Sequence, residues 1–211
     1  MNDRFSWELF ERMPLIGIMR NMPEAVIDTI AHYYAEAGLT NLEITMNSEG
    51  AVGTIALLVR NYGRNMNIGA GTVLTLDDLD QALSAGARFI VTPVVNEDVI
   101  LACAGKNIPV FPGAYTPTEI YKAWKMGAGM VKVFPAGKLG VDYIREVLAP
   151  MNYLKLLPTG GITLHNYMEY LRAGAAGVGL GSNLFPKDII RDKNWDELRK
   201  TFDRFVSAFQ R

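Results

Sequence analysis

The segment Ala37–Thr45, AGLTNLEIT, joins a predicted helix to a predicted strand. Gly38 is a typical C-terminal stop for the helix over residues 23–37, whose apolar side chains recur on one face. Residues 41–45 are mostly apolar rather than alternating, which indicates a parallel strand that is covered on both sides. Similar junctions, Ala85-Gly86-Ala87 and Ala173-Gly174-Ala175, precede two further apolar runs.

This pattern of strand and helix extends along the whole chain. The eight predicted strands are Leu15–Met19, Asn41–Thr45, Asn67–Ala70, Phe89–Thr92, Pro109–Phe111, Met130–Phe134, Leu154–Leu157 and Gly177–Leu180. Helical spacing is found at Phe5–Met13, Pro23–Ala37, Asp77–Ala85, Thr118–Met126 and Trp195–Phe209. The rival fold, a doubly wound open sheet, lacks its glycine-rich turn after the first strand. The sequence therefore predicts an α/β protein: a (β/α)8 TIM barrel over residues 1–211, with an added N-terminal and C-terminal helix.

The composition bounds the class of protein. A chain of 211 residues suits one compact domain or two small ones, and 49% apolar with 20% charged residues is ordinary for a water-soluble protein. The net charge of −1 gives no reason to expect a nucleic-acid or membrane partner. The single cysteine, Cys103, and the lack of a signal-like or membrane-spanning apolar run predict a cytoplasmic protein.

Two ionisable residues interrupt apolar strands. Lys132 lies within residues 130–134 and Glu43 within residues 42–45. Burial favours a neutral lysine amine, which can attack a ketone and form a Schiff base, while a nearby carboxyl group can move the proton. The alternative, a purely structural ion pair inside the barrel, remains open at this point. Lys155 is a weaker candidate, because it lies near the N-terminal end of its strand and barrel active sites lie at the other end.

Polar and glycine residues follow several strands at their carboxyl ends. Thr159, Gly160 and Gly161 follow the seventh strand, and Gly181 and Ser182 follow the eighth, which is where barrels often bind phosphate. Either cluster alone could be an ordinary turn. Thr72, after the third strand, offers a hydroxyl and an N–H, and Arg20, after the first, is a candidate carboxylate ligand.

No metal or cofactor site is expected. The two histidines, His32 and His165, are predicted to be surface or capping residues, His165 at the start of a helix. There is no HxH or HExxH pattern and no cluster of carboxylates with metal-ligand spacing.

Seven short motifs occur in order along the chain. They are LEIT (42–45), GAGTVL (69–74), TP (92–93), FPG (111–113), TPTE (116–119), VKVFPA (131–136) and PTGGI (158–162). This ordered set resembles the 2-keto-3-deoxy-6-phosphogluconate / 4-hydroxy-2-oxoglutarate aldolase family, class I. The resemblance covers about residues 14–185.

The resemblance implies a role for each of these residues. Lys132 would form the Schiff base with the pyruvyl portion, and Glu43 would be the general acid and base, acting through water. Thr72 would bind the pyruvate carboxylate. The other implied substrate-binding residues are Pro93, Phe134, Thr159, Gly160, Gly161, Gly181 and Ser182. It also implies cleavage to pyruvate and glyceraldehyde 3-phosphate, and a homotrimer.

One position departs from this family pattern. The phosphogluconate branch typically has arginine four residues after the catalytic glutamate, where this chain has Asn47. The related 2-keto-3-deoxy-6-phosphogalactonate aldolases are similar to this chain there, with an arginine at the end of the first strand, the position of Arg20. We therefore expect Arg20 to serve the carboxylate. The alternatives are the phosphogalactonate or 4-hydroxy-2-oxoglutarate activity, another phosphate-binding barrel enzyme such as an isomerase or synthase without a Schiff base, or a sugar-phosphate binding module without catalysis.

Overall fold

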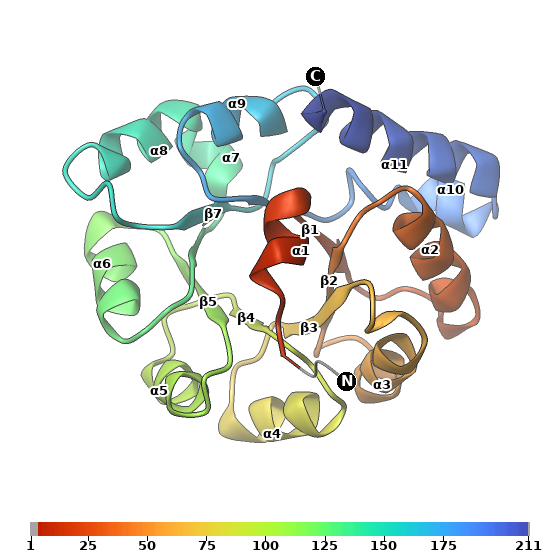
Figure 1. Cartoon of the computed structure of the whole chain (residues 1–211), viewed down its shortest axis with the longest axis horizontal. Coiled ribbons are helices and arrows are strands. Elements are labelled where there is room, and N and C mark those ends of the chain that lie inside the picture. Colours follow the sequence, from red (N-terminus) through yellow and green to blue (C-terminus); the bar gives the residue numbers. More distant parts are fainter. Residues whose placement is uncertain (1–3, 211) are drawn as a thin grey trace.

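A computed structural model describes residues 4–210, so Met1–Asp3 and Arg211, the ends of the predicted domain, lie outside the described residues. Eight parallel strands form one sheet in the order β7-β6-β5-β4-β3-β2-β1-β8. A parallel bridge between Thr159 and Gly179 joins its two edges, so the sheet closes on itself as the predicted (β/α)8 barrel (Figure 1). The strands are β1 Leu15–Met19, β2 Asn41–Thr45, β3 Asn67–Gly71, β4 Ile90–Thr92, β5 Val110–Ala114, β6 Val131–Val133, β7 Leu156–Pro158 and β8 Val178–Leu180.

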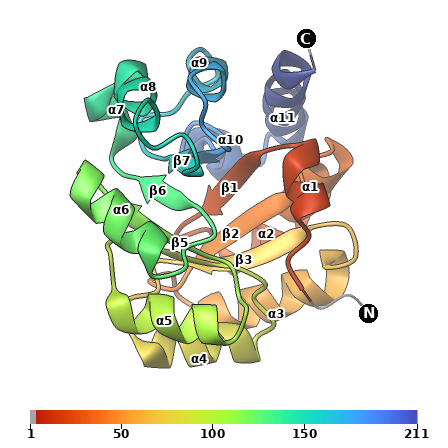
Figure 2. The same ribbon diagram turned by 60° about the vertical axis from the view of Figure 1, so that its left-hand side comes forward.

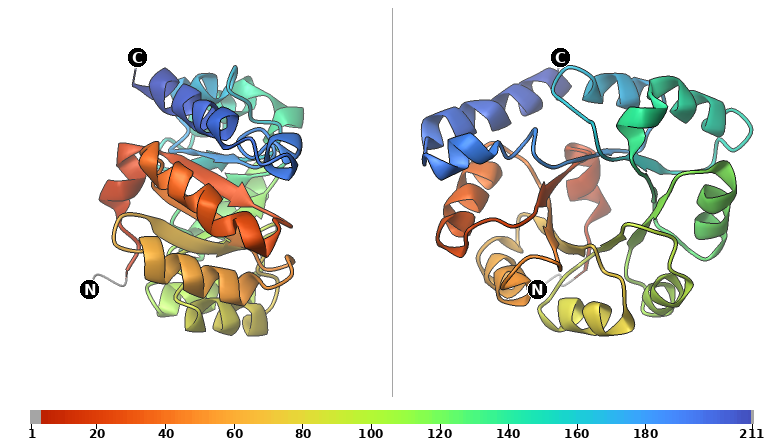
Figure 3. Two further views of the ribbon diagram at one scale, coloured as in Figure 1. Left: turned by 90° about the vertical axis from the view of Figure 1, so that its right-hand side faces the viewer. Right: turned by 180° about the vertical axis from the view of Figure 1, so that it is seen from behind.

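Ten helices surround the ring of strands on the outside (Figure 1). They are α2 Glu24–Glu36, α3 Ala51–Tyr62, α4 Leu76–Ser84, α5 Glu97–Gly105, α6 Pro117–Lys125, α7 Ala136–Leu139, α8 Val141–Leu148, α9 Tyr167–Arg172, α10 Lys187–Arg191 and α11 Trp195–Phe209. The remaining helix of the described residues is α1 Trp7–Arg12. The C-terminal helix α11 packs against α2, with the Tyr34 and Phe202 rings 5.5 Å apart. The predicted C-terminal helix is confirmed, and with α10 it completes the ring between α9 and α2 (Figure 3).

The N-terminal helix α1 covers the end of the barrel where the strands begin (Figures 2 and 3). Its N-cap, Ser6, exchanges two hydrogen bonds of 2.8 Å with the side chain of Asn67, the first residue of β3. The Thr40 hydroxyl donates a hydrogen bond to the Leu9 carbonyl at 2.7 Å. Lys155, directly before β7, also lies at this end, with Nζ 4.9 Å from the Trp7 ring centroid. Its predicted place near the N-terminal end of the strand is confirmed.

The barrel interior at the end covered by α1 is filled by a separate apolar cluster. Phe5 and Phe10 from the N-terminal segment pack there against side chains that lie in strands or directly before them: Ile16, Phe89, Val91, Phe111, Met130 and Leu157. Two glycines make room for these rings. A Cβ on Gly69 would lie 2.4 Å from the Phe89 ring, and one on Gly177 would lie 2.6 Å from Phe10. The half of the barrel in which the strands begin is therefore filled with buried apolar side chains.

The alternation of side chains along each strand explains the isolated charges in apolar runs. Leu42 and Ile44 belong to the core between strands and helices, so Glu43 points to the barrel interior. By the same alternation, Val131 and Val133 face the helices and Lys132 faces inward. Both charged residues thus lie inside the barrel, above the apolar cluster.

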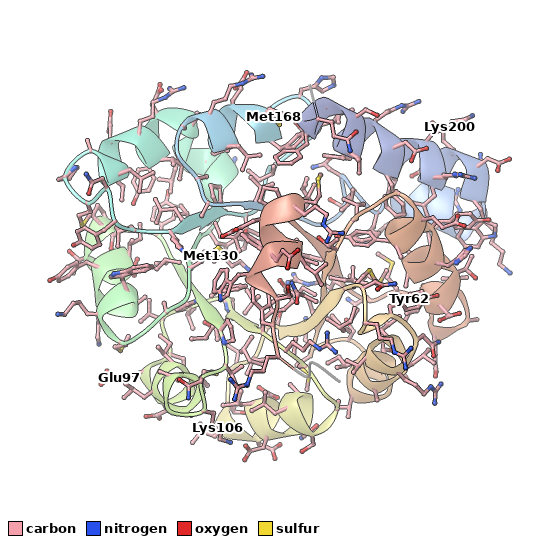
Figure 4. All side chains as sticks on the ribbon, viewed as in Figure 1. Tyr62, Glu97, Lys106, Met130, Met168 and Lys200 are labelled. Atoms are coloured by element: carbon pink, nitrogen blue, oxygen red, sulfur yellow. The ribbon has the colours of Figure 1, made fainter. Side chains whose placement is uncertain are left out.

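Most other charged side chains lie on the outer helices. Glu97, Lys106 and Lys200 project from the rim of the molecule (Figure 4), and all three form surface salt bridges of 3.3–3.4 Å. Among the described residues, no helix combines the length and apolarity needed to cross a bilayer.

Tyr34 connects α2 to the barrel, and its replacement tests this connection. Its hydroxyl accepts a hydrogen bond from the Gly17 N–H (3.1 Å) and donates one to the Asn41 carbonyl (2.6 Å), with the side chain fully buried. Tyr34→Phe leaves both backbone groups without this partner and should lower the free energy of unfolding by about 1–3 kcal/mol. Chemical denaturation measures this loss. Tyr153→Phe, at an exposed tyrosine, is the control, and equal stability of the two variants would contradict the expectation.

Candidate active site

A cavity of about 320 Å³ opens at the end of the barrel where the strands finish. Its lining brings together eight of the eleven predicted site residues: Arg20, Lys132, Phe134, Thr159, Gly160, Gly161, Gly181 and Ser182. Its charged lining residues are Arg20, Lys132 and Lys187, all positive. The cavity therefore suits an anionic ligand.

Lys132 lies in the middle of β6, paired in register with Gly113 of β5, and its side chain is 5% exposed. Burial lowers its pKa, the nearby Glu43 carboxylate opposes this, and Arg20 adds to the lowering. The amine is therefore neutral, and nucleophilic, at a lower pH than that of an ordinary lysine. Its Nζ lies 5.1 Å from the centroid of the Phe134 ring, whose face would favour a cation formed on this nitrogen.

Glu43 reaches the same interior from β2 and is 2% exposed. Its carboxyl group occupies the space where Gly71 of β3 has no side chain: a Cβ there would lie 1.7 Å from Oε1. Burial raises the pKa of Glu43, while Lys132 and Arg20 act in the opposite direction. Oε1 is buried with no hydrogen-bond partner among the described residues, an arrangement that costs free energy and is typical of a group held ready for a ligand or a proton.

The structural ion pair between these two residues is not formed. Among residues 4–210, no salt bridge within 4.0 Å joins Lys132 to Glu43. They affect each other's charge over a longer distance. The Glu43 carboxyl group is therefore not held by the amine, as it would be in a structural ion pair.

Arg20 and Thr72 meet at the edge of the cavity. The Arg20 guanidinium donates a hydrogen bond of 3.3 Å to the Thr72 hydroxyl. Thr72 has φ +57°, a costly conformation for a β-branched residue that is often found at functional sites. Asn21, next to Arg20, has φ +51°, and its N–H donates a hydrogen bond of 2.9 Å to Ser48. Ser48 thereby ties the Arg20 loop to the end of β2.

The two glycine loops present donors rather than acceptors to the cavity. The carbonyl of Gly160 accepts from the Gly137 N–H (2.7 Å), and that of Gly161 from the Asn166 amide (3.2 Å). The Gly181 carbonyl accepts hydrogen bonds from the backbone N–H groups of Leu184 and Phe185, just before α10, at 2.9–3.0 Å. Within the part of the chain that the structure describes, the N–H groups of Gly160, Gly161, Gly181 and Ser182 have no protein acceptor. Four N–H groups without acceptors at the cavity edge form an anion site.

Thr159 lies between the two loops and is 5% exposed. Its hydroxyl donates to the Leu157 carbonyl at 3.2 Å, and a Cβ on Gly179 would lie 2.4 Å from its Oγ1. The Asn183 amide then donates to the Ile162 carbonyl at 2.8 Å and ties the two loops together. The closure of the barrel between β7 and β8 thus fixes both halves of the anion site.

Three predicted residues are not in the cavity lining. Glu43 is buried in the barrel interior, where Gly71 leaves space for its carboxyl group. Thr72 accepts a hydrogen bond from Arg20, which does line the cavity. Pro93 is a partly buried residue after β4, and its carbonyl lies where a Gly113 side chain would be. Of the two histidines, His32 forms a surface pair with Glu36 at 3.4 Å, as predicted. His165 is exposed, but it does not open a helix, because α9 begins at Tyr167.

Eight lining residues were missed: Ile18, Asn21, Met22, Ile162, Gly179, Asn183, Phe185 and Lys187. Lys187 could have been found from its place five residues after Ser182, at the start of the element that follows the glycine loop. The others carry no chemical signal in the sequence. Among the described residues, no three His, Cys, Asp or Glu side chains group as a metal site.

Known proteins are similar to this chain in sequence and in fold. The family described as KDPG and KHG aldolase matches residues 8–201. KDPG stands for 2-keto-3-deoxy-6-phosphogluconate and KHG for 4-hydroxy-2-oxoglutarate. A 2-dehydro-3-deoxy-phosphogluconate aldolase of Haemophilus influenzae is 41% identical over 170 residues, 80% of each chain. A 2-dehydro-3-deoxy-6-phosphogalactonate aldolase of Escherichia coli is 36% identical over 177 residues, 82% of this chain and 85% of that protein.

Among solved structures, one of KDPG aldolase from Legionella pneumophila has a TM-score of 0.85 and 29% identity, and the match covers 92% of this chain and 95% of that chain. It holds pyruvate, captured at low pH as a covalent carbinolamine intermediate. The sequence and structural matches extend over nearly the whole barrel. The chain therefore belongs to the KDPG and KHG aldolase family.

Proposed function

We propose that this protein is a class I aldolase that cleaves 2-keto-3-deoxy-6-phosphogluconate to pyruvate and glyceraldehyde 3-phosphate. The observation that carries the proposal is the buried Lys132 beside a cavity whose charged lining residues are all positive, with a buried carboxyl group behind it. Such a substrate has a carboxylate at one end, a ketone beside it and a phosphate at the other end. The cavity offers a matching group for each.

Lys132 would begin the reaction as a neutral amine. It attacks the C2 ketone to give a carbinolamine, which loses water and becomes an iminium ion. The C3–C4 bond then breaks: its electron pair moves toward the iminium nitrogen and forms an enamine, and the C4 hydroxyl loses its proton. Protonation of the enamine at C3 and hydrolysis release pyruvate. The Phe134 ring below Nζ favours the cationic iminium.

Glu43 would change roles as the charge on Lys132 changes. Before the iminium forms, burial raises the pKa of the Glu43 carboxyl group, so it can donate the proton that leaves with water. After the iminium forms, a fixed positive charge lies nearby and lowers that pKa. The resulting carboxylate can take the proton of the C4 hydroxyl.

Arg20 would bind the substrate carboxylate, with Thr72 beside it. A guanidinium can hold a carboxylate with two charge-assisted hydrogen bonds. The Ser48–Asn21 hydrogen bond, together with the contact to Thr72, holds Arg20 at the cavity edge. Asn47, which stands where the phosphogluconate branch has its arginine, is exposed and outside the cavity lining.

The substrate's phosphate would bind to the N–H groups of Gly160, Gly161, Gly181 and Ser182, with Thr159 along the substrate chain. The phosphogalactonate acid is the second candidate substrate, because a phosphogalactonate aldolase is 36% identical to this chain and Arg20 occupies the strand-one position of that branch. Higher identity to a phosphogluconate aldolase, 41%, and the Pro158–Ile162 motif favour the first.

We further propose that the chain is a single cytoplasmic domain that forms homotrimers. Leu74, Val94 and Tyr115 are 42–51% exposed and follow the neighbouring strands β3, β4 and β5. A face of this kind, next to the cavity, supports a contact between copies of the chain. The single cysteine, Cys103, is a buried free thiol, in keeping with a reducing compartment.

Borohydride reduction in the presence of pyruvate tests the Schiff base directly. Mass spectrometry should find one reduced pyruvate adduct on Lys132. Lys132→Met should abolish it, whereas Lys155→Met, at the rival lysine, should not. A folded protein without an adduct would favour an isomerase or synthase of the same fold.

The wild-type protein should also cleave the phosphogluconate acid faster than its C4 epimer, and the reverse order would support the phosphogalactonate assignment.

The pH dependence of adduct formation tests the electrostatics of Lys132. The rate should rise with pH and level off below the pH range of an exposed lysine, because burial lowers the pKa of Lys132. Glu43→Gln removes the charge that raises this pKa, so the midpoint should move to lower pH. Arg20→Ala removes a charge that lowers it, so the midpoint should move to higher pH. Shifts in the same direction in both variants would contradict this account.

Arg20→Ala should also raise the KM for the keto acid about ten- to a hundredfold, because a charged hydrogen bond contributes about 1.5–3 kcal/mol. Steady-state kinetics at a pH above the Lys132 midpoint of both proteins measures it. Arg172→Ala, at an exposed arginine outside the cavity lining, should leave KM unchanged. If Arg20→Ala also leaves KM unchanged, another group binds the carboxylate.

A further inference from the structure

Lys187 is a charged residue of the cavity for which the reaction outlined above has no use. It is the first residue of α10, just after the loop that contains Gly181 and Ser182, and it lines the same cavity. It is exposed, and within residues 4–210 it forms no salt bridge or side-chain hydrogen bond. Its ammonium group is therefore available to a ligand.

The glycine loops leave a need for such a charge. Their N–H groups can orient a phosphate, but they carry no formal charge, whereas a phosphate ester is close to a dianion at neutral pH. The cavity lining contains two other cations, and both have tasks at the opposite end of the substrate: Lys132 at the ketone and Arg20 at the carboxylate. Lys187 is the remaining positive residue of the lining.

The position of Lys187 relative to the loops is fixed by the backbone. The Gly181 carbonyl accepts hydrogen bonds from the N–H groups of Leu184 (2.9 Å) and Phe185 (3.0 Å), and Phe185 is fully buried. Asn183 ties this loop to the one after β7. The start of α10 is therefore anchored beside all four free N–H groups, while the long Lys187 side chain can adjust to the ligand.

We propose that Lys187 binds the terminal phosphate of the substrate and makes the enzyme prefer phosphorylated over unphosphorylated keto acids. This inference rests on the proposed function, since it assigns a partner to the far end of that substrate. Lysine acts on phosphate as a compact point charge. An exposed charge of this kind is screened by salt, so its effect falls as ionic strength rises.

Binding of inorganic phosphate, measured by calorimetry at low ionic strength, tests Lys187 without any catalytic step. Lys187→Met should weaken phosphate binding about ten- to a hundredfold, the range for a lost charged hydrogen bond. Lys187→Arg should restore most of it. Lys193→Met is the matched control, at an exposed lysine just after α10 and outside the cavity lining, and should bind phosphate like the wild type.

Kinetics with two substrates supplies the second readout. For the phosphorylated keto acid, Lys187→Met should lower kcat/KM by a similar factor, mainly through KM. For the unphosphorylated 2-keto-3-deoxy acid, kcat/KM should stay within about twofold, which a general loss of folding could not produce.

The outcomes separate this inference from the proposed function. If the wild type and Lys187→Met bind phosphate equally, or if both substrates lose kcat/KM alike, the role of Lys187 is overturned while the pyruvate adduct on Lys132 still stands. If phosphate binding falls as expected but no adduct forms, Lys187 keeps its role as an anion ligand and the aldolase proposal fails.

Discussion

Lys132 and Glu43 are both withdrawn from water inside the barrel, and much of the surrounding structure follows from keeping them there. Burial shifts the two pKa values toward the uncharged forms, down for the amine and up for the carboxyl group. The absence of a side chain on Gly71 leaves the space in which the Glu43 carboxyl group lies. With no salt bridge joining the pair among the described residues, neither group is neutralised by direct contact with the other.

The apolar half of the barrel makes this burial possible. Phe5 and Phe10 from the N-terminal segment fill the end where the strands begin, together with Phe89 and Phe111. Gly69 and Gly177 leave open the space that the Phe89 and Phe10 rings occupy. Water can therefore reach the two ionisable groups only from the other end, where the substrate would enter. An opening at both ends would lessen the desolvation on which the reactivity of Lys132 depends.

The sequence predicted those parts of the site that depend on a single strand or loop. A lysine and a glutamate stood out because each is an isolated ionisable residue inside an apolar run. The structure adds that alternation along each strand turns both side chains inward. Strand ends were less accurate: residues 154–157 were predicted where β7 is Leu156–Pro158, since the ends depend on pairing with neighbouring strands. The Asn183–Ile162 hydrogen bond was missed, because it joins two loops that come together only when β8 closes the barrel.

The loop after β1 is held in place by a residue that follows the neighbouring strand β2. With Asn47 after β2, this chain has no arginine at the position usual in the phosphogluconate branch, yet the next residue, Ser48, accepts a hydrogen bond from Asn21. That bond fixes the left-handed turn after Arg20, and Arg20 in turn contacts Thr72. The ends of β1 and β2 are adjacent in the barrel, with Met19 paired in register with Ile44. Under the proposed function, a guanidinium after either strand would therefore lie near the same substrate carboxylate.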